Sequence, residues 1–195
     1  MALDTARERL AKLLVERSYL EGEFVLASGR RSRFYFDCRR TTCFSEAMPL
    51  IGEAFLAAFR AAGTAARSVG GLTSGADPIA NAVAYCSQAR GSGPVLQMFS
   101  VRKERKSHGT GQWIEGCAVS PVAIVNDVVT SGGSVIRAIE RARGEGLEVV
   151  HVATLVDREE GGLEAIQRAV PQVPVTALFK KGELDALRAQ QHGAR

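Results

Sequence analysis

The sequence predicts an α/β domain in which a central parallel sheet is flanked by helices. From about residue 64 onward, short apolar runs alternate with amphipathic stretches, and strands separated by helices favour right-handed βαβ units. A chain of 195 residues, 46% hydrophobic and 24% charged, can also bury a sizeable core. We therefore expect a single domain over residues 1–195, with at most a small appended lobe.

The N-terminal third predicts two helices on either side of a β-hairpin. Apolar residues recur at helical spacing over about residues 5–20, and Asp4 is available as the N-cap. The runs FVLAS and RFYFD, joined by GRR, have the composition of paired strands. A second amphipathic helix is expected over residues 45–62, with Ser45 as its cap and Gly63 at the C′ position.

The rest of the chain predicts buried strands that alternate with helices. Strands are expected at RSVGGL, VLQMF, VAIV, VVHVATLV and VTALF, and helices from Pro78, Ser134, Leu163 and Glu183. Parallel sheets bind ligands in the crevice outside the carboxyl ends of their strands. Functional residues are therefore expected directly after VGG, VLQMF, VAIV and VATLV.

Several features bear on the location of the protein. No stretch reaches the length of about eighteen apolar residues that a membrane helix needs. The N-terminus lacks the apolar region of a signal peptide, and the acids Asp4, Glu8 and Glu16 are atypical of a transit peptide. We expect a cytoplasmic protein with no membrane partner.

Charge and cysteine content narrow the function classes further. A formal net charge of +4 suits an anionic small substrate, an acidic partner or nucleic acid, without choosing among them. The cysteines form no CxxC pair, so neither a disulfide framework nor a zinc site is expected. The positive charges gather in two clusters, Arg30, Arg31, Arg33, Arg39 and Arg40, and Arg102, Lys103, Arg105 and Lys106.

The strongest chemical pattern is VAIVNDVVTSGGSVIRAIERA, an apolar strand followed by a small-residue loop and a helix. This order makes an anion site, because the backbone N–H groups of residues 131–134 can point inward and the helix dipole favours a phosphate there. Further donors are the hydroxyls of Thr130, Ser131 and Ser134. The loop lacks the lysine of a Walker A motif and the spacing GxGxxG. The alternative is an ordinary helix cap and tight turn.

Asp127 stands directly before this loop, where a carboxylate would repel a phosphate unless it serves a ribose hydroxyl pair or a bound magnesium ion. The run VAIVNDVVTSGGS resembles the signature with which type I phosphoribosyltransferases bind 5-phosphoribosyl 1-diphosphate (PRPP). That signature has four apolar residues, two acids, two apolar residues and Thr-x-Gly-x-Ser/Thr. In this chain Asn126 replaces the first acid.

The resemblance implies the type I phosphoribosyltransferase fold, with a small N-terminal hood contributed largely by about residues 1–40. It implies that Asp127 meets the ribose hydroxyls and that residues 130–134 bind the 5-phosphate. The PRPP-binding residues implied in this segment are Asn126, Asp127, Val128, Val129, Thr130, Ser131, Gly132, Gly133 and Ser134. Mg²⁺ is the implied cofactor, held mainly by oxygens of the ligand rather than by a protein metal cage.

A second segment, RKERKSHG, resembles the catalytic loop of the orotate phosphoribosyltransferases, Arg-Lys-x-x-Lys-x-His-Gly. A cationic loop suits a diphosphate leaving group, because it can stabilise the developing anion. Taken alone, such a run is usually a solvated face. The resemblance implies that Lys106 and His108 are catalytic together with Asp127, and that the diphosphate is contacted by Arg102, Lys103, Lys106 and His108.

Three further segments resemble the same family: LASGRRSRFYFD, VGGLTSGADPIANAVA and VATLVDREEGG. They imply that orotate lies against Tyr35 and Phe36, and that its polar edge and carboxylate meet Thr130 and Arg158, since a guanidinium matches a carboxylate bidentately. The alternatives are core packing for the aromatic pair and a salt bridge to a neighbouring glutamate for the arginine. Lysines common in the family are absent at Ala27 and next to Gly75, and we expect one of the adjacent arginines at 39 and 40 to compensate.

The family resemblance implies an enzyme that converts orotate and PRPP to orotidine 5′-phosphate and diphosphate, a step of pyrimidine synthesis. It also implies a homodimer in which the catalytic loop is shared between subunits, with no nucleic-acid partner. Two alternatives remain open from the sequence. One is a phosphoribosyltransferase for another base. The other is a nucleic-acid-binding regulator of the same fold that senses PRPP, for which the cluster from Arg30 to Arg40 could bind a phosphate backbone.

Overall fold

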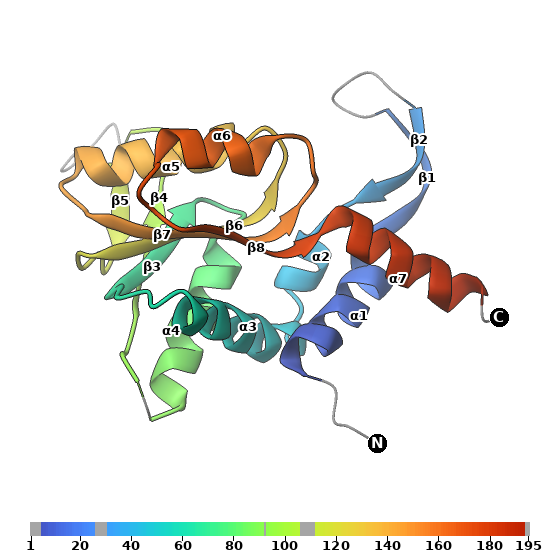
Figure 1. Ribbon diagram of the computed structural model, residues 1–195, viewed down its shortest axis with the longest axis horizontal. Helices are drawn as coiled ribbons and strands as arrows, with labels where there is room; N and C mark the ends of the chain where they lie inside the picture. The colour runs from blue at the N-terminus through green and yellow to red at the C-terminus, as the bar shows by residue number, and fades with distance from the viewer. Residues whose placement is uncertain (1–4, 26–30, 92, 106–111, 194–195) are drawn as a thin grey trace.

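The computed structural model describes residues 5–25, 31–91, 93–105 and 112–193. Its centre is a six-stranded sheet in the order β5-β4-β3-β6-β7-β8 (Figure 1). The strands are β3 (Ser68–Leu72), β4 (Gln97–Val101), β5 (Ile114–Gly116), β6 (Val122–Val129), β7 (Val149–Asp157) and β8 (Val175–Lys180). Every neighbouring pair is parallel except β4 and β5, which are antiparallel. The predicted α/β class with a mainly parallel sheet is confirmed.

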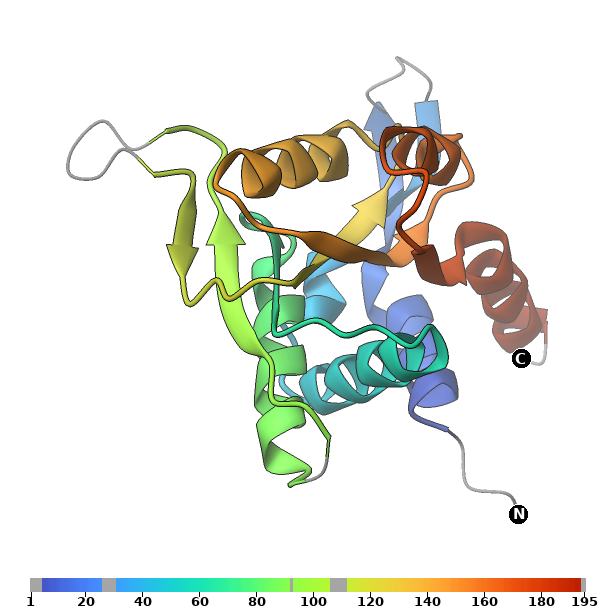
Figure 2. The ribbon, with the colours of Figure 1, turned by 60° about the vertical axis from the view of Figure 1, so that its left-hand side comes forward.

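Helices cover both faces of this sheet (Figure 2). On one face lie α3 (Ala47–Ala61) and α4 (Asp77–Ala89), and on the other α5 (Gly133–Gly144) and α6 (Gly162–Ala169). Successive side chains of β6 point to opposite faces of the sheet. Ala123 therefore packs in the core beneath α3 and α4, and Ile124 packs in the core beneath α5 and α6. Strands buried on both faces explain the continuous apolar runs of the sequence.

The strand order contains a switch point between β3 and β6. From β3 the chain continues to β4 on one side, whereas β6, β7 and β8 follow one another on the other side. The carboxyl ends of β3 and β6 therefore border a crevice, which is the place where open α/β sheets bind ligands.

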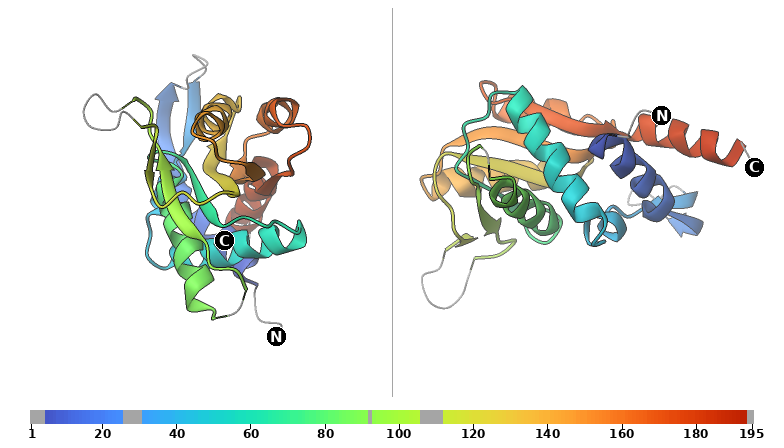
Figure 3. Two further views of the ribbon diagram at one scale, coloured as in Figure 1. Left: turned by 90° about the vertical axis from the view of Figure 1, so that its left-hand side faces the viewer. Right: turned by 90° about the horizontal axis from the view of Figure 1, so that it is seen from below.

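A separate hairpin of β1 (Tyr19–Val25) and β2 (Arg31–Phe36) lies with α1 (Ala6–Ser18) and α7 (Lys181–Gly193) at one end of the molecule (Figure 3). The C-terminal helix is tied to the hairpin, since the Tyr19 hydroxyl donates to Asp185 at 2.6 Å. The Tyr19 ring in turn contacts Phe36 edge-on, with 5.0 Å between ring centroids. These elements form the expected N-terminal hood, but its support includes the C-terminal end of the chain.

Two expected helix caps are wrong. Thr5 caps α1 in a capping box with Glu8, which leaves no capping role for Asp4, a residue outside the described part of the chain. Ser45 does not cap α3, because that helix begins one residue later than a serine cap requires and has Glu46 as N-cap without a side-chain hydrogen bond. Gly63, with a φ of +63°, does follow the end of α3 as expected.

Two short elements were not anticipated. The antiparallel strand β5 has three residues, and the helix α2 (Arg39–Thr42) has four, so neither is long enough to produce a periodic pattern. The strand expected at VLQMF begins two residues later, at Gln97. The four cysteines are free, as expected. No helix within the described ranges is long and apolar enough to cross a membrane.

Candidate functional site

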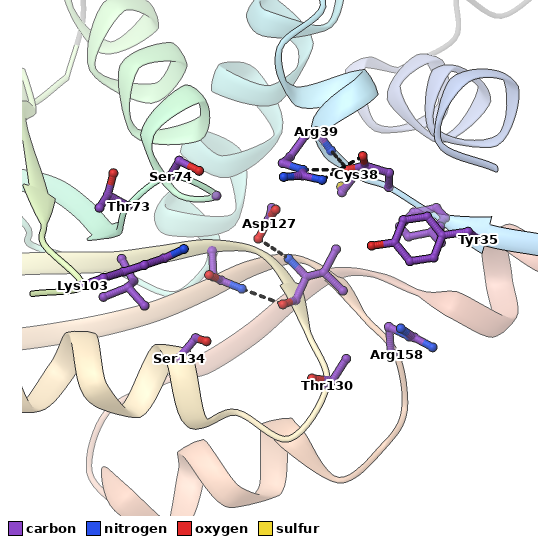
Figure 4. A pocket seen from close by; sticks show the side chains of 16 residues that line it. Tyr35, Cys38, Arg39, Thr73, Ser74, Lys103, Asp127, Thr130, Ser134 and Arg158 are labelled. Carbon is purple, nitrogen blue, oxygen red and sulfur yellow. Dashed lines mark hydrogen bonds and ion pairs between the residues drawn. The ribbon is translucent and has the colours of Figure 1, made fainter. Parts of the chain in front are cut away.

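A cavity of about 390 Å³ lies at the switch point, between the carboxyl ends of the strands and the hood (Figure 4). Its walls come from the ends of β3, β4, β6 and β7, from the start of α5 and from the segment that joins β2 to α2. The lining residues are Tyr35, Phe36, Asp37, Cys38, Arg39, Leu72, Thr73, Ser74, Gly75, Lys103, Asn126, Asp127, Val128, Thr130, Ser134 and Arg158.

The end of β6 forms the centre of the cavity. Asn126 is 6% exposed, and its amide donates to the Val128 carbonyl at 2.7 Å. The Asp127 carboxylate accepts a hydrogen bond from the Val128 N–H at 2.8 Å. Burial raises the pKa of Asp127 above its usual value, opposed by backbone hydrogen bonds and by the charge of Arg39. Asp127 is thus a partly desolvated carboxylate, and its negative charge would interact strongly with a ligand bound beside it.

The loop after β6 leads into α5 in the way that an anion site requires. Gly132, the N-cap of α5, has a φ of +82°, and no side chain caps the helix. A Cβ at this glycine would lie 2.7 Å from the Gly162 carbonyl oxygen, so close packing also excludes a larger residue. The backbone N–H groups of the first turn are therefore free of a side-chain cap and can bind an anion.

Only some of the predicted residues of this loop line the cavity. Val128, Thr130 and Ser134 line the cavity, whereas Val129 is buried in the core at 1% exposure. The lining does not include Ser131, Gly132 and Gly133. These three residues form the turn itself, so only backbone groups or a short hydroxyl could reach a ligand from them.

A loop after β3, which sequence reasoning did not single out residue by residue, forms another wall. Asp77 organises it, since the hydroxyls of Thr73 and Ser100 donate to its two carboxylate oxygens at 2.6 and 2.8 Å. A Cβ at Gly75 would lie 2.6 Å from an oxygen of Asp127, so only glycine lets this loop approach the carboxylate so closely. The resemblance of the segment TSGADP to a known family was the available signal for these residues.

The predicted cationic residues are only partly brought together. Lys103, beyond the end of β4, lines the cavity. Arg102 does not line it, and pairs instead with Glu115 of β5 at 2.8 Å. The Arg102 carbonyl accepts from Arg141 of α5 at 2.5 Å, which ties this strand end to the helix. The other two expected residues, Lys106 and His108, lie outside the described residues.

The hood supplies an aromatic wall. Tyr35 and Phe36 both line the cavity, and Tyr35 is 40% exposed, more than core packing would allow. Facing them, Arg158 makes the anticipated salt bridge to Glu160 at 3.0 Å. Its Nε, however, is buried without a hydrogen-bond partner among the described residues. A buried donor of this kind is costly unless a ligand satisfies it.

Together these groups form a site for a polyanion with a planar portion. An open helix N-terminus, a desolvated carboxylate and the cations Lys103, Arg39 and Arg158 surround one space, with aromatic rings at its hood end. Among the described residues, we find no cluster of three or more His, Cys, Asp or Glu side chains that could hold a metal ion.

Comparison with known proteins finds relatives that match most of this chain. Residues 51–171 match the model of the phosphoribosyl transferase domain. The chain is 44% identical to the orotate phosphoribosyltransferase of Rhodopirellula baltica over 175 residues, 85% of this chain and 89% of the relative. It is similar to the crystal structure of Mycobacterium tuberculosis H37Rv orotate phosphoribosyltransferase with Fe(III) dicitrate, with a TM-score of 0.80, 36% identity and coverage of 92% and 98%. The structure of the M. tuberculosis protein with PRPP gives a TM-score of 0.77, 34% identity and coverage of 92% and 99%.

Proposed function

Because this chain belongs to the phosphoribosyl transferase family and, within it, to the orotate phosphoribosyltransferases, we propose how its pocket performs their reaction. The enzyme transfers the ribose 5-phosphate of PRPP to orotate, giving orotidine 5′-phosphate and diphosphate in pyrimidine synthesis. The observation that carries our assignment of roles is the meeting, in one crevice, of the open first turn of α5, the Asp127 carboxylate and cationic side chains.

We propose that the 5-phosphate of PRPP binds at residues 130–134. Backbone N–H groups of the α5 first turn and the hydroxyl of Ser134 would donate to it, and the helix dipole adds to the attraction. Asp127 would accept hydrogen bonds from the ribose hydroxyls. Asn126 and Val128 would fix the backbone around Asp127, since the Asn126 amide donates a hydrogen bond to the Val128 carbonyl.

The chemistry breaks the bond between ribose C1 and the diphosphate oxygen and forms a bond from C1 to a ring nitrogen of orotate, which loses its proton to the departing diphosphate or to solvent. Positive charge develops at C1, and we propose that the Asp127 carboxylate stabilises it. The diphosphate leaves with the bonding electrons, and Lys103 lies where it can stabilise that charge. Lys106 and His108, outside the described residues, are proposed to stabilise or protonate the same group, and Arg102 to join them by exchanging its pairing with Glu115.

Orotate is proposed to lie against Tyr35 and Phe36. The support is the unpaired Nε of Arg158 opposite the two rings, because an orotate carboxylate would satisfy it. Thr130, which also lines the cavity, would donate to the polar edge of the base.

The pocket fits Mg²⁺ as a cofactor that binds with the donor. Asp127, with the hydroxyls of Thr73 and Ser74, supplies the hard oxygen atoms that magnesium prefers, and this ion is usually held by one or two carboxylates and the substrate phosphates. We propose that Asp127 is the residue that would hold it, and that the bound ion supplies charge neutralisation for the diphosphate. Thr73 is already fixed for such a role by its hydrogen bond to Asp77.

We further propose that the protein is cytoplasmic and acts as one domain over residues 1–195. A homodimer that shares the catalytic loop between subunits is proposed as the working form. Small molecules, namely PRPP and orotate, are its proposed partners, with neither nucleic acid nor membrane.

The experiment that tests this function measures diphosphate release from PRPP and Mg²⁺ with orotate, uracil, adenine, hypoxanthine or xanthine added in turn. Release with orotate alone is the expected result. Release with another base would identify a different phosphoribosyltransferase. If no base supports release while RNA shifts the melting temperature and PRPP does not, the protein is a regulator rather than an enzyme.

A further inference from the structure

Arg39, the first residue of α2, reaches the pocket from the hood side. Of the two adjacent arginines at positions 39 and 40, only Arg39 lines the cavity. Asp37 holds its guanidinium at two points, because the Arg39 Nε donates to one carboxylate oxygen at 2.9 Å and Nη2 donates to the other at 3.0 Å. The Arg39 backbone N–H also donates to Asp37, at 3.1 Å. These hydrogen bonds orient the Arg39 guanidinium in the absence of a ligand.

This ion pair has little to contribute to the fold itself. The Arg39 side chain is 59% exposed, and an exposed pair of this kind contributes only about 0–1 kcal/mol to stability. Within the described part of the chain, no partner besides Asp37 binds the guanidinium. One edge of Arg39 is therefore left for a group in the cavity.

The position of Arg39 relative to Asp127 indicates which group it meets. Thr130 and Ser134 lie on one side of Asp127, and Arg39 and Ser74 lie on the other (Figure 4). In PRPP the 5-phosphate and the C1 diphosphate are at opposite ends of the ribose, with the hydroxyls between them. With the 5-phosphate at the start of α5 and the hydroxyls at Asp127, the diphosphate would extend to the side of the cavity on which Arg39 and Ser74 lie.

We infer that Arg39 is a further substrate-binding residue, which contacts the diphosphate of PRPP, and that Asp37 positions it. This assignment rests on the proposed function and adds a residue to it. A guanidinium donates two parallel hydrogen bonds to a phosphate, which a lysine ammonium cannot do. Arg39 begins α2 shortly after the strand that carries Tyr35, so a donor bound at Arg39 would lie close to the wall against which the base is proposed to lie.

The test compares three probes by isothermal titration calorimetry in the presence of Mg²⁺: PRPP, inorganic diphosphate and ribose 5-phosphate. Arg39→Met should weaken PRPP and diphosphate by about tenfold or more, as expected for a lost hydrogen bond to a charged group, and leave ribose 5-phosphate unchanged. Asp37→Asn should give a smaller loss on the same two probes. Arg40→Met, an exposed neighbour outside the cavity, is the matched control and should leave all three affinities unchanged.

Arg39→Lys separates charge from shape, and should recover only part of the lost affinity. Unchanged diphosphate binding in Arg39→Met overturns the inference. So does an equal loss on all three probes, since the residue would then support the pocket as a whole. A parent protein that binds none of the probes contradicts the proposed function itself, and binding by the parent with no difference in Arg39→Met contradicts only this inference.

Discussion

Asn126 and Asp127 are adjacent, but their side chains have different surroundings. Both line the cavity, but Asn126 is almost fully buried and donates to a backbone carbonyl, whereas Asp127 is less buried and accepts a hydrogen bond from a backbone N–H. An isosteric amide at 127 could still accept a hydrogen bond from a hydroxyl but could not stabilise positive charge at C1. Asp127→Asn should therefore lower turnover by a factor of about a hundred or more, measured as steady-state rate. Retention of most of the rate would show that the carboxylate does not have this role.

Asn126→Asp tests the departure from the family signature. The new carboxylate would face the Val128 carbonyl that the amide now donates to, so we expect a loss of about 1–3 kcal/mol in unfolding free energy. The variant should stay active and change chiefly in its dependence on magnesium and pH, because a second acid adds charge near the donor. Rates against Mg²⁺ concentration and pH decide this. A parent that is inactive until Asn126 becomes Asp would contradict the proposed roles of the pair.

His151 is a buried group outside the cavity, and the proposed reaction gives it no role. It is fully buried in β7, its Nε2 lies 2.9 Å from the Thr176 hydroxyl, and its Nδ1 contacts the Thr64 hydroxyl. Burial lowers its pKa from 6.5 to about 4. In that pH range the unfolded chain binds a proton that the folded chain does not, so stability is highest above pH 6.5 and falls toward pH 4.

The expected loss from this histidine is about 3 kcal/mol over the whole range. Urea unfolding between about pH 7 and about pH 4.5 measures it, with His151→Asn as the control because an amide does not titrate. The variant should be less stable at neutral pH but show a shallower decline. Parallel declines in parent and variant would mean that other groups cause the pH dependence.

Residues at the site differ in how far sequence alone could identify them. Asp127 and Thr130 stand in a strand, loop and helix pattern that predicts an anion site on physical grounds. Thr73 and Arg39 could not be found in this way, because what brings each to the cavity is a contact with a carboxylate, Asp77 or Asp37, that depends on loop geometry. The positions of lining residues on loops depend on tertiary contacts, which the periodicity of the sequence does not reveal.

The loop between β6 and α5 requires a glycine at position 132. Gly132→Ala places a Cβ in a left-handed conformation and 2.7 Å from the Gly162 carbonyl. The variant should lose about 1 kcal/mol or more of unfolding free energy and bind ribose 5-phosphate more weakly. Gly144→Ala, at the other end of α5, meets nothing within 4 Å and should gain about 0.5–1 kcal/mol. Urea unfolding of both variants tests the contrast, which equal effects would contradict.

At the scale of elements, the long strands and helices could be predicted because burial on both faces of β6 and β7 gives unbroken apolar runs. The caps of α1 and α3 could not, since several nearby polar residues satisfy the same rule and packing selects among them. The antiparallel strand β5 was missed for a different reason. Three residues carry no period, and the position of β5 depends on its pairing with β4.

Over the whole molecule, the walls of the pocket belong to two separate sheets. The hairpin supplies the aromatic wall and the six-stranded sheet supplies the proposed anion site, so in the proposed binding mode their relative position decides whether base and donor can meet. Contacts of α7 and α1 connect the two parts, since Tyr19 donates to Asp185 and the Arg7 guanidinium donates to the Leu178 carbonyl at 2.9 Å. The C-terminal helix thus supports the site without lining it.

The proposed homodimer makes the last prediction, which concerns two chains rather than one. A Lys106→Ala chain lacks a proposed loop cation but keeps the donor site, and an Asp127→Ala chain has the reverse defect. If the loop of each subunit serves its partner's site, one site in each mixed dimer has both functions intact. Mixing the two inactive proteins, after dissociation and reassociation, should therefore restore up to about a quarter of the parent activity, because half of the dimers are mixed and half of their sites are complete.

Each variant mixed with itself is the control and should stay inactive. The double variant Lys106→Ala/Asp127→Ala mixed with the parent in equal amounts is a second test, because a shared loop leaves no complete site in their mixed dimers. Activity should then fall to about a quarter of the parent activity, whereas a loop that serves its own subunit would leave about a half. Restoration requires that intact residues on different chains meet at one site, and a loop that serves only its own subunit cannot provide this. If the mixture shows no activity although mixed dimers are demonstrated by native mass spectrometry, the loop acts within its own chain, and the pocket of one subunit contains all the groups that the reaction uses.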